Sequence, residues 1–318
     1  MRQEWPALNG SPGVLHSRAL PPPGPMRTLS TLAVLLAPLA LSGCVQDAGG
    51  AGPVVYFSAI PDDNRSGLQA RYDLVALALT DALGVRFDYQ PSTDYEASVE
   101  AFKNGDVLLA WFGGVSGVRA RLAVPGAQAI AQGRVDPQFR TYFIAHQDLG
   151  LEFSEEFPMA LRGNRFTFGS RGSTSGRLMP QHFLMQETGQ GPQEFFGHPP
   201  QFTAGHDQTA LQVQAGSASA GALNYKTYER MVAEGTVDPA VCRHIWTTPP
   251  YADYNWTAHP ALNQLHGEDF MERIQAFLIT LDDPAVLEAL DRTEGLIPAK
   301  NADYAAIEAT MRQTGLLR

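Results

Sequence analysis

The sequence RFTFGSRGSTSGRLMP at residues 165–180 joins a strand pattern to a helix pattern through a glycine-rich loop. Alternating Phe166 and Phe168 predict a short strand, and the glycines that follow predict a loop. Three hydroxyl residues, Ser173, Thr174 and Ser175, then come just before a helical pattern. A helix start offers free backbone N–H groups and the positive end of the helix dipole. The stretch therefore predicts a strand, a loop and a helix start that together carry the groups of a small anion site.

The same residues could also form structures other than an anion site. A capped helix with turn glycines and no ligand would have the same pattern. Arg171 and Arg177 could add positive charge to an anion site, or they could be solvated or paired elsewhere. A phosphate-binding P-loop needs a lysine and a spacing that the stretch lacks. A nucleophile elbow needs a central serine, whereas the segment from Gly172 to Gly176 is centred on Thr174.

The composition excludes some classes of protein. The chain has 318 residues and a formal net charge of -10, which argues against binding to nucleic acid, because a phosphate backbone is met by basic patches. The negative charge does not exclude a small anion, since a local ring of donors can outweigh distant charges. No metal-binding pattern stands out among the eight histidines. We therefore expect no cofactor, no metal and no catalysis.

The amino terminus resembles an export signal. An apolar run at residues 29–41 follows Arg27 and is too short to span a bilayer, which takes about 20 residues. The run ends in LSGC, which resembles the lipobox of bacterial lipoproteins and implies that Cys44 is lipidated. The alternatives are a signal peptide that is cleaved elsewhere and a cysteine that stands at this position by chance. We predict that translation starts at Met26.

The domain organisation follows from these signals. Residues 1–43 are predicted to be a mis-assigned leader plus signal peptide, and residues 44–53 a lipidated cysteine with a flexible tether. The folded protein would then work in the periplasm as a membrane-anchored lipoprotein.

Strand and helix patterns alternate along the folded chain. We expect a mostly parallel α/β sheet from the first series, in which Asp94 caps a helix and Gly105 ends it. A strand at 141–146 and an acidic helix at 154–161 are expected next, before the stretch at 165–180, and a second alternating series of helices and strands is expected at 207–247. Crossing segments near 140–145 and 249–256 predict two lobes with a ligand cleft between them. Lobe 1 is expected to comprise residues 54–140 and 257–318, and lobe 2 residues 141–256.

Several blocks of the sequence resemble one family along most of the chain. These blocks are FTFGSRGSTSGRLMP, STDYEASVEAFKNGDVLLAWFGGVSG, AGHDQTALQVQAGSASAGALNYKTYE and IWTTPPYADYNW. They are similar to the phosphonate-binding (PhnD-like) family of periplasmic solute-binding proteins of ABC importers. The phrases LAWFGGVSG, PGAQAIAQG and FTFGSRGSTSGRLMP look closest to a subgroup named for selenate import.

The resemblance implies a type II periplasmic-binding-protein fold, in which two α/β lobes joined by two crossover strands close on the ligand. It also implies roles for individual residues. Tyr95 matches a tyrosine that touches the anion from the first lobe, and His206 matches a binding histidine. The hydroxyls at 173–175 match the anion-binding triplet, and Tyr142 falls near an aromatic residue that lines the cleft. The alternatives are a packing role for Tyr95 and a capped surface position for His206.

One departure from the family narrows the ligand. Members that recognise an aminoalkyl group place a carboxylate just after the strand that here ends at Asn224. This chain continues with Tyr225 and Lys226, so an ammonium group would lack its partner and meet a like charge. We therefore predict a ligand without an ammonium group, although Asp253 could substitute for the missing acid. The residue types leave selenate, phosphite, phosphonate and sulfate open.

The predicted function is that of a monomeric extracytoplasmic receptor. It would capture a tetrahedral oxyanion and hand it to the permease and ATPase of an ABC importer. The alternative is a periplasmic subunit that senses an oxyanion and signals to a membrane histidine kinase.

Overall fold

The computed structural model describes residues 52–63 and 65–317, which belong to one compact unit of the chain. The predicted leader, the predicted lipidation site at Cys44 and most of the tether lie outside the described residues. Within the described part, no helix is both long enough and apolar enough to cross a membrane.

Lobe 1 is built on a six-stranded sheet with the order β11-β4-β10-β3-β1-β2 among the described residues. β1 pairs in parallel with β2 and β3, whereas β10 runs antiparallel between β3 and β4. The sheet is therefore mixed and not mostly parallel, because the strand that returns from lobe 2 runs in the opposite direction. The strands are β1 (Val55–Ala59), β2 (Phe87–Tyr89), β3 (Leu109–Phe112), β4 (Gln128–Gly133), β10 (Asn255–Ala258) and β11 (Leu296–Pro298).

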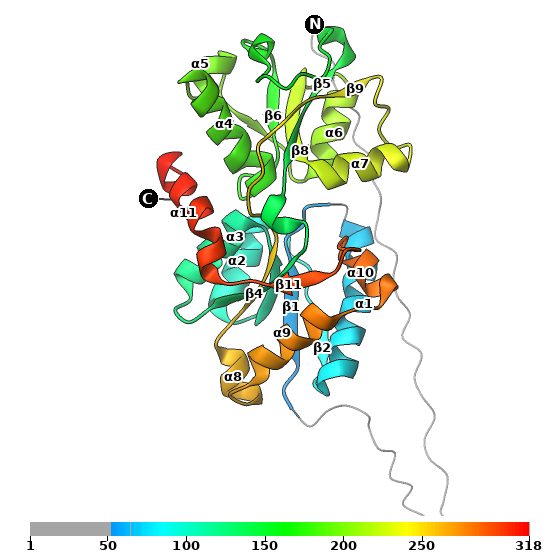
Figure 1. Cartoon of the computed structure of the whole chain (residues 1–318), viewed down its shortest axis with the longest axis vertical. Helices are drawn as coiled ribbons and strands as arrows, with labels where there is room; N and C mark the ends of the chain where they lie inside the picture. Colours follow the sequence, from blue (N-terminus) through cyan, green and yellow to red (C-terminus); the bar gives the residue numbers. More distant parts are fainter. Residues whose placement is uncertain (1–51, 64, 318) are drawn as a thin grey trace, which may run out of the picture. The chain divides into compact units, whose positions relative to one another are not determined.

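The helices of lobe 1 come from both ends of the described chain. Figure 1 shows the orange and red helices of the carboxyl end in the same lobe as the blue and cyan elements of the amino end. The helices are α1 (Arg65–Leu83), α2 (Tyr95–Asn104), α3 (Gly114–Ala123), α8 (Ala261–His266), α9 (Phe270–Thr280), α10 (Pro284–Ala289) and α11 (Ala305–Gln313).

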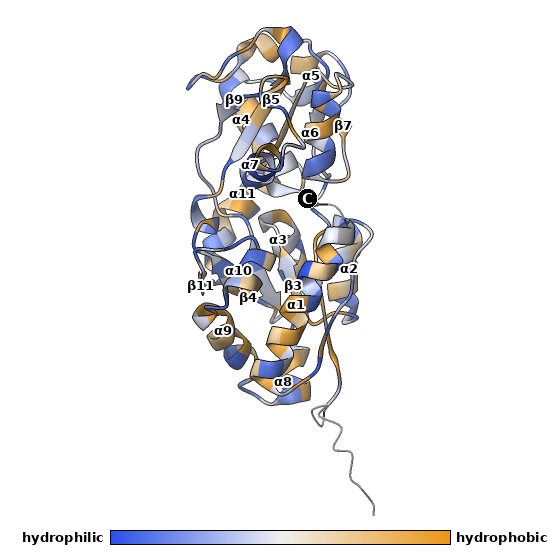
Figure 2. Cartoon of the chain, turned by 90° about the vertical axis from the view of Figure 1, so that its right-hand side faces the viewer, coloured by the Kyte–Doolittle hydropathy of each residue, from blue (hydrophilic) through white to orange (hydrophobic). Residues whose placement is uncertain are grey.

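α2 confirms the predicted capping pattern. Asp94 accepts a hydrogen bond from the Ala97 N–H at 2.8 Å, and Gly105 ends the helix in the left-handed region at φ 80°. Its buried residues Tyr95, Val99 and Phe102 recur at helical spacing. Figure 2 shows hydrophobic and hydrophilic turns mixed along this helix, as expected for one buried face and one exposed face.

Lobe 2 is built on a five-stranded sheet with the order β7-β6-β8-β5-β9 among the described residues. β6 is parallel to β8, and β5 is antiparallel to both of its neighbours. Its strands are β5 (Thr141–His146), β6 (Phe166–Phe168), β7 (Gln201–Phe202), β8 (Ala220–Asn224) and β9 (Cys242–Thr247). Its helices are α4 (Met179–Thr188), α5 (Pro192–Phe196), α6 (His206–Gln214) and α7 (Tyr225–Ala233).

The predicted acidic helix at 154–161 is wrong. The chain there is irregular, with one short 3₁₀ turn at Met159–Leu161. Pro158 disfavours a helix through this segment, because proline restricts the residue before it and lacks an N–H. The Phe157 ring instead packs edge-on against Phe143 and Trp246, with ring centroids 5.8 and 5.2 Å apart. Tertiary packing of one aromatic side chain therefore outweighs the local pattern.

The two crossing segments pair with each other between the sheets. Phe139 and Tyr251 exchange both of their backbone hydrogen bonds, at 2.9 and 3.0 Å. β5 begins directly after the first crossing, and β10 directly after the second. The predicted architecture of two α/β lobes joined by two crossing strands is therefore confirmed (Figure 1).

Candidate functional site

The loop after β6 forms the centre of the candidate site. Ser173 Oγ accepts a hydrogen bond from the Gly176 N–H at 2.9 Å and so caps the start of the helix. Residues Thr174–Leu178 then form one wide π-helical turn before α4 continues. Such turns are rare and recur at functional sites. The predicted strand, loop and helix start is confirmed, with the wide turn as an addition.

Two glycines hold this loop in a tight arrangement. The Gly169 N–H donates to the Gly176 carbonyl at 2.7 Å. A Cβ on either glycine would lie 3.0 Å from the Cα of the other. A side chain at either position would separate the strand end from the helix start. The glycines therefore allow the three hydroxyl residues to project from one compact turn.

The three hydroxyl residues are buried where the lobes meet. Ser173, Thr174 and Ser175 are each about 2% exposed or less. Thr174 Oγ1 accepts a hydrogen bond from the Val115 N–H, at the start of α3 in lobe 1, at 3.0 Å. Ser175 Oγ lies 3.5 Å from His206 Nε2. The structure therefore brings the triplet together with the predicted histidine and with a helix start from the other lobe.

His206 is the first residue of α6 and its side chain is buried. Its Nδ1 accepts a hydrogen bond from the Asn224 N–H at 3.3 Å. Burial lowers the pKa of His206 to about 4, so the imidazole is neutral near pH 7. Because Nδ1 accepts, the proton lies on Nε2, which faces Ser175. His206 can thus donate a hydrogen bond into the site without carrying a charge.

Tyr95 enters the site from lobe 1 as the first residue of α2. It is 1% exposed, and its hydroxyl makes no hydrogen bond of ordinary geometry within the described residues, although the Ser173 side chain is close to it. Burial raises the pKa of Tyr95 well above its usual range, and the nearby Ser173 side chain opposes this only in part. The hydroxyl therefore stays protonated and available as a donor. A buried polar group without a partner is costly, which favours a ligand at this point.

Asp253, in the second crossing segment, lies beside the candidate site, although the sequence suggested it only as a partner for an amine. Its Oδ1 accepts a hydrogen bond from the Gly114 N–H at 2.9 Å, and its Oδ2 is buried without a partner in the described structure. Burial raises the pKa of Asp253 to about 7. The usable signal in the sequence is one acid inside a segment of prolines and aromatic residues.

Tyr142 is not brought into this group. Neighbours along a strand point to opposite faces, and it is Thr141 whose hydroxyl donates to the Ser175 carbonyl, at 2.8 Å. The Tyr142 hydroxyl donates to Glu229 at 2.7 Å, and its ring stacks on His244 with centroids 3.7 Å apart. Tyr142 therefore lies on the other face of β5.

The guanidinium groups of both arginines of the loop lie over aromatic rings, and Arg177 Nη1 is buried without a hydrogen-bond partner in the described structure. The Arg171 guanidinium lies 3.9 Å from the centre of the Phe202 ring, and that of Arg177 lies 4.8 Å from the centre of Phe168. These contacts fit the alternative in which the arginines are paired with other groups of the protein. The site is thus formed by neutral donors and one carboxyl group.

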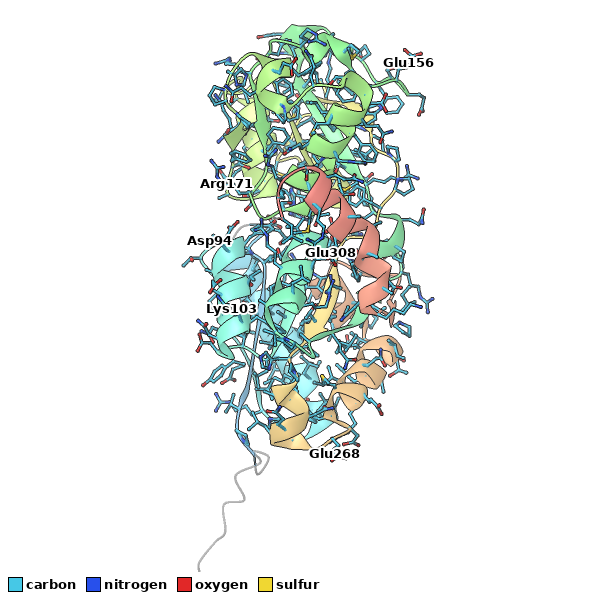
Figure 3. All side chains as sticks on the ribbon, turned by 90° about the vertical axis from the view of Figure 1, so that its left-hand side faces the viewer. Asp94, Lys103, Glu156, Arg171, Glu268 and Glu308 are labelled. Atoms are coloured by element: carbon cyan, nitrogen blue, oxygen red, sulfur yellow. The ribbon has the colours of Figure 1, made fainter. Side chains whose placement is uncertain are left out.

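Direct contacts between the lobes close the site. The His206 N–H donates to the Asp62 carbonyl at 3.1 Å, and Ser116 Oγ donates to the Gly172 carbonyl at 3.3 Å. A pocket of about 870 Å³ remains at the edge of this junction, lined by Asp94 of lobe 1 and Arg171 of lobe 2 (Figure 3). The structure is therefore a closed arrangement with its binding groups inside.

The chemistry of the site suits binding better than catalysis. Hydroxyls, a neutral imidazole and backbone N–H groups are donors for the oxygens of a tetrahedral anion. Ser175 is near His206, but an imidazole whose pKa is held near 4 is a poor base for activating a hydroxyl. Among the described residues, no cluster of His, Cys, Asp and Glu could hold a metal ion.

Comparisons with known proteins identify the family of this chain. Residues 57–304 match the family described as ABC transporter, phosphonate, periplasmic substrate-binding protein. The chain is 35% identical to the probable ABC transporter phosphite binding protein PhnD1 of Prochlorococcus marinus, over 83% of this chain and 91% of that protein. It is 26% identical to the phosphate-import protein PhnD of Mycolicibacterium smegmatis, over 84% of this chain and 88% of that protein.

A solved structure shows the same architecture. The structure of Prochlorococcus marinus PhnD1 in complex with methylphosphonate superposes with a TM-score of 0.78, covering 83% of this chain and 99% of that one at 35% identity. The two-lobe periplasmic binding-protein fold is thereby confirmed, as is a role in transport and not in catalysis. This chain belongs to the family of periplasmic substrate-binding proteins of phosphonate ABC transporters.

Proposed function

We propose that this protein captures a compact tetrahedral oxyanion of the phosphite or methylphosphonate type between its lobes. The observation that carries the proposal is the set of buried donors around residues 173–175, above all the Tyr95 hydroxyl without a partner. Its relatives support the same class, since one is named for phosphite and its structure holds methylphosphonate. The closed form would bind the anion better because donors from both lobes reach it only there.

Asp253 favours an anion that can carry a proton. An ionised carboxylate repels an anion, so either Asp253 or the ligand has to be protonated when both are present. Phosphite, phosphate and methylphosphonate can hold a proton near neutral pH, whereas selenate and sulfate cannot. We therefore rank phosphite and methylphosphonate above selenate. Binding of selenate would need a protonated Asp253 and would weaken as the pH rises through about 7.

Isothermal titration with phosphite, methylphosphonate, phosphate, selenate, sulfate and 2-aminoethylphosphonate tests the proposal. We expect phosphite or methylphosphonate to bind with a micromolar or tighter dissociation constant, since four charge-assisted hydrogen bonds contribute roughly 1.5–3 kcal/mol each before association costs. Selenate is expected to bind more weakly at alkaline pH. The proposal fails if 2-aminoethylphosphonate or sulfate binds far more tightly than phosphite and methylphosphonate.

The site assignment has its own variants. Thr174→Val combined with Ser175→Ala should abolish binding, because the pair removes two hydroxyls from the triplet. Ser154→Ala combined with Thr280→Val is a matched control, since both of these hydroxyls are exposed and serve only local backbone contacts. Unchanged affinity in the first pair, with the fold intact by circular dichroism, would refute the assignment.

The route of the ligand and the membrane anchor belong to the same proposal. We infer that the receptor is a monomer, held at the membrane by lipid on Cys44, and that it delivers its anion to a permease and an ATPase. Cys44→Ala should abolish the incorporation of labelled palmitate into the protein. Incorporation of the label into that variant would contradict lipidation at this residue.

A further inference from the structure

Four residues form a ring of hydrogen bonds next to the candidate anion site. The Asn224 N–H donates to His206 Nδ1 at 3.3 Å, and Asn224 Nδ2 donates to Tyr254 Oη at 3.2 Å. Tyr254 Oη donates to Asp62 Oδ2 at 2.7 Å, and the His206 N–H donates to the Asp62 carbonyl at 3.1 Å. The ring therefore joins two residues of lobe 2, one of the crossing segment and one of lobe 1.

We propose that Asn224 is a positioning residue that couples the donor orientation of His206 to closure of the lobes. The inference rests on the proposed function, because it takes the His206 Nε2–H as a donor to the anion. The Asn224 N–H occupies Nδ1 and so leaves the proton on Nε2. The Asn224 side chain then connects the same backbone position to Tyr254 and, through it, to lobe 1.

The backbone N–H, Nδ2 and Oδ1 of Asn224 each form a hydrogen bond with a different residue. The residue is 4% exposed and stands between the end of β8 and the start of α7. Its Oδ1 accepts from the Lys226 N–H at 2.8 Å and caps α7, while its N–H and Nδ2 serve the ring. Aspartate at this position could cap the helix but has no Nδ2 donor. Serine could also cap the helix, but its side chain is too short to reach the Tyr254 hydroxyl. Asparagine supplies both functions from one position.

Residues of lobe 1 hold Tyr254 in place independently of the ring of hydrogen bonds. Its carbonyl accepts from Tyr304 Oη at 3.1 Å, and its aromatic ring stacks on Trp111 with centroids 5.7 Å apart. The Arg292 guanidinium lies 4.8 Å from the centre of the Tyr254 ring. Tyr254 is thus held in place, and its hydroxyl forms one hydrogen bond with Asn224 of lobe 2 and one with Asp62 of lobe 1.

Asp62 is the member that depends on closure. It lies in the loop after β1 of lobe 1 and receives one hydrogen bond on its backbone carbonyl and one on its carboxylate. Opening the lobes would separate Asp62 from His206. The ring is therefore complete only in the closed arrangement, in which His206 faces the buried hydroxyls.

Asn224→Ser tests the side-chain role without losing the helix cap. The serine hydroxyl can still cap α7, the backbone N–H to His206 remains, and only the link to Tyr254 is lost. We expect phosphite to bind about tenfold more weakly to this variant, as expected for one lost hydrogen bond, with little change in the melting temperature of the ligand-free protein. Asn224→Ala removes the cap as well and should lower that melting temperature.

A double-mutant cycle tests whether the hydrogen bond between Asn224 and Tyr254 contributes to phosphite binding. Tyr254→Phe removes the hydroxyl that receives the Asn224 amide, so adding Asn224→Ser to it should cost no further affinity for phosphite. Tyr228→Phe is the matched control, because it removes one buried hydroxyl whose partner, the Cys242 carbonyl, lies in the same lobe. The control is expected to bind phosphite as the wild type does.

These measurements distinguish failure of the hydrogen-bond ring from failure of the proposed function. The proposal is wrong if the losses of phosphite affinity from Asn224→Ser and Tyr254→Phe are additive. It is also wrong if both variants bind phosphite as the Tyr228→Phe control does. Small-angle X-ray scattering of the ligand-free proteins gives a readout without any anion, since loss of the ring should shift the variants toward a larger radius of gyration. If the wild type binds none of the oxyanions yet the variants expand, the proposed function fails and the ring stands. If neither variant expands, the ring does not hold the lobes.

Discussion

At Gly172 the backbone of lobe 2 lies close to lobe 1 near the candidate site. A Cβ there would lie 2.8 Å from Tyr95 Cβ and 3.2 Å from Glu96 Oε1. We predict that Gly172→Ala leaves the fold intact but blocks full closure. Overpacking of this kind costs about 1–3 kcal/mol, a roughly 5–150-fold loss of affinity for phosphite. Isothermal titration measures the loss.

The control for this substitution is Gly191→Ala in the same lobe. Nothing lies within 4 Å of a Cβ at Gly191, and its backbone does not need a glycine. This control should bind phosphite normally. A normal affinity for Gly172→Ala as well would show that the closed contact at Gly172 does not limit binding.

The carboxyl of Asp253 gives a prediction about pH and stability. Burial raises its pKa from 3.8 to about 7, so between these values the folded state binds more protons than the unfolded state. The free energy of unfolding of the ligand-free protein therefore falls as the pH rises through this window. Asp253→Asn should remove that loss, so the variant gains stability relative to the wild type between about pH 4 and about pH 8.

Thermal unfolding of both proteins across this pH range checks the sign. The pKa of His206 is lowered from 6.5 to about 4, so His206 contributes stability that rises with pH. This contribution is common to both proteins and cancels in their difference. A difference that is flat with pH would contradict the raised pKa of Asp253.

At the scale of elements, α7 connects the lobes through ion pairs. Lys226 Nζ lies 3.4 Å from Asp291 Oδ1, and Arg230 pairs with Asp63, so two cations of one lobe 2 helix reach acids of lobe 1. Asp291 holds a positive φ of 53°, which is unusual for a residue other than glycine. The helix is therefore placed to favour the closed form.

Lys226→Met with Arg230→Met should weaken phosphite binding by a few fold. Partly exposed pairs contribute about 0–1 kcal/mol each, and about 1 M salt should remove most of the difference from the wild type. Arg243→Met is the control, because its partner Glu152 lies in the same lobe. Titrations at low and high salt measure the effect. An equal loss in the control would show that the pairs of α7 have no special role in closure.

Elements with strong local signals were predictable from the sequence. The cap at Asp94 and the end at Gly105 depend on local backbone chemistry, and both are confirmed. The π-turn at Thr174–Leu178 was not predictable, since nothing in TSGRL distinguishes it from an ordinary first turn. The helix predicted at 154–161 is absent, because Pro158 disfavours it, and the Phe157 ring in this segment packs on Trp246.

At the scale of the whole molecule, the sequence indicated two lobes but not the direction of every strand. β10 returns from lobe 2 and inserts antiparallel between β3 and β4, which makes the sheet of lobe 1 mixed. Its pattern of apolar residues is the same for either direction, because side chains alternate in both. Direction follows from where the chain re-enters the sheet, and this is a property of the complete fold.

The strand, loop and helix start at residues 165–180 could be predicted from the chain alone, because they depend on local patterns of glycine, hydroxyl and apolar residues. The family and its two-lobe architecture were predicted from the resemblance of longer sequence blocks to known proteins, and the comparisons confirm both. The surroundings of the candidate site residues became visible only in the folded structure. That structure placed Asp253 beside the site, left Tyr142 on the other face of β5, and made His206 a neutral donor. These properties depend on burial and on contacts between distant segments, which cannot be predicted from a short segment of the sequence.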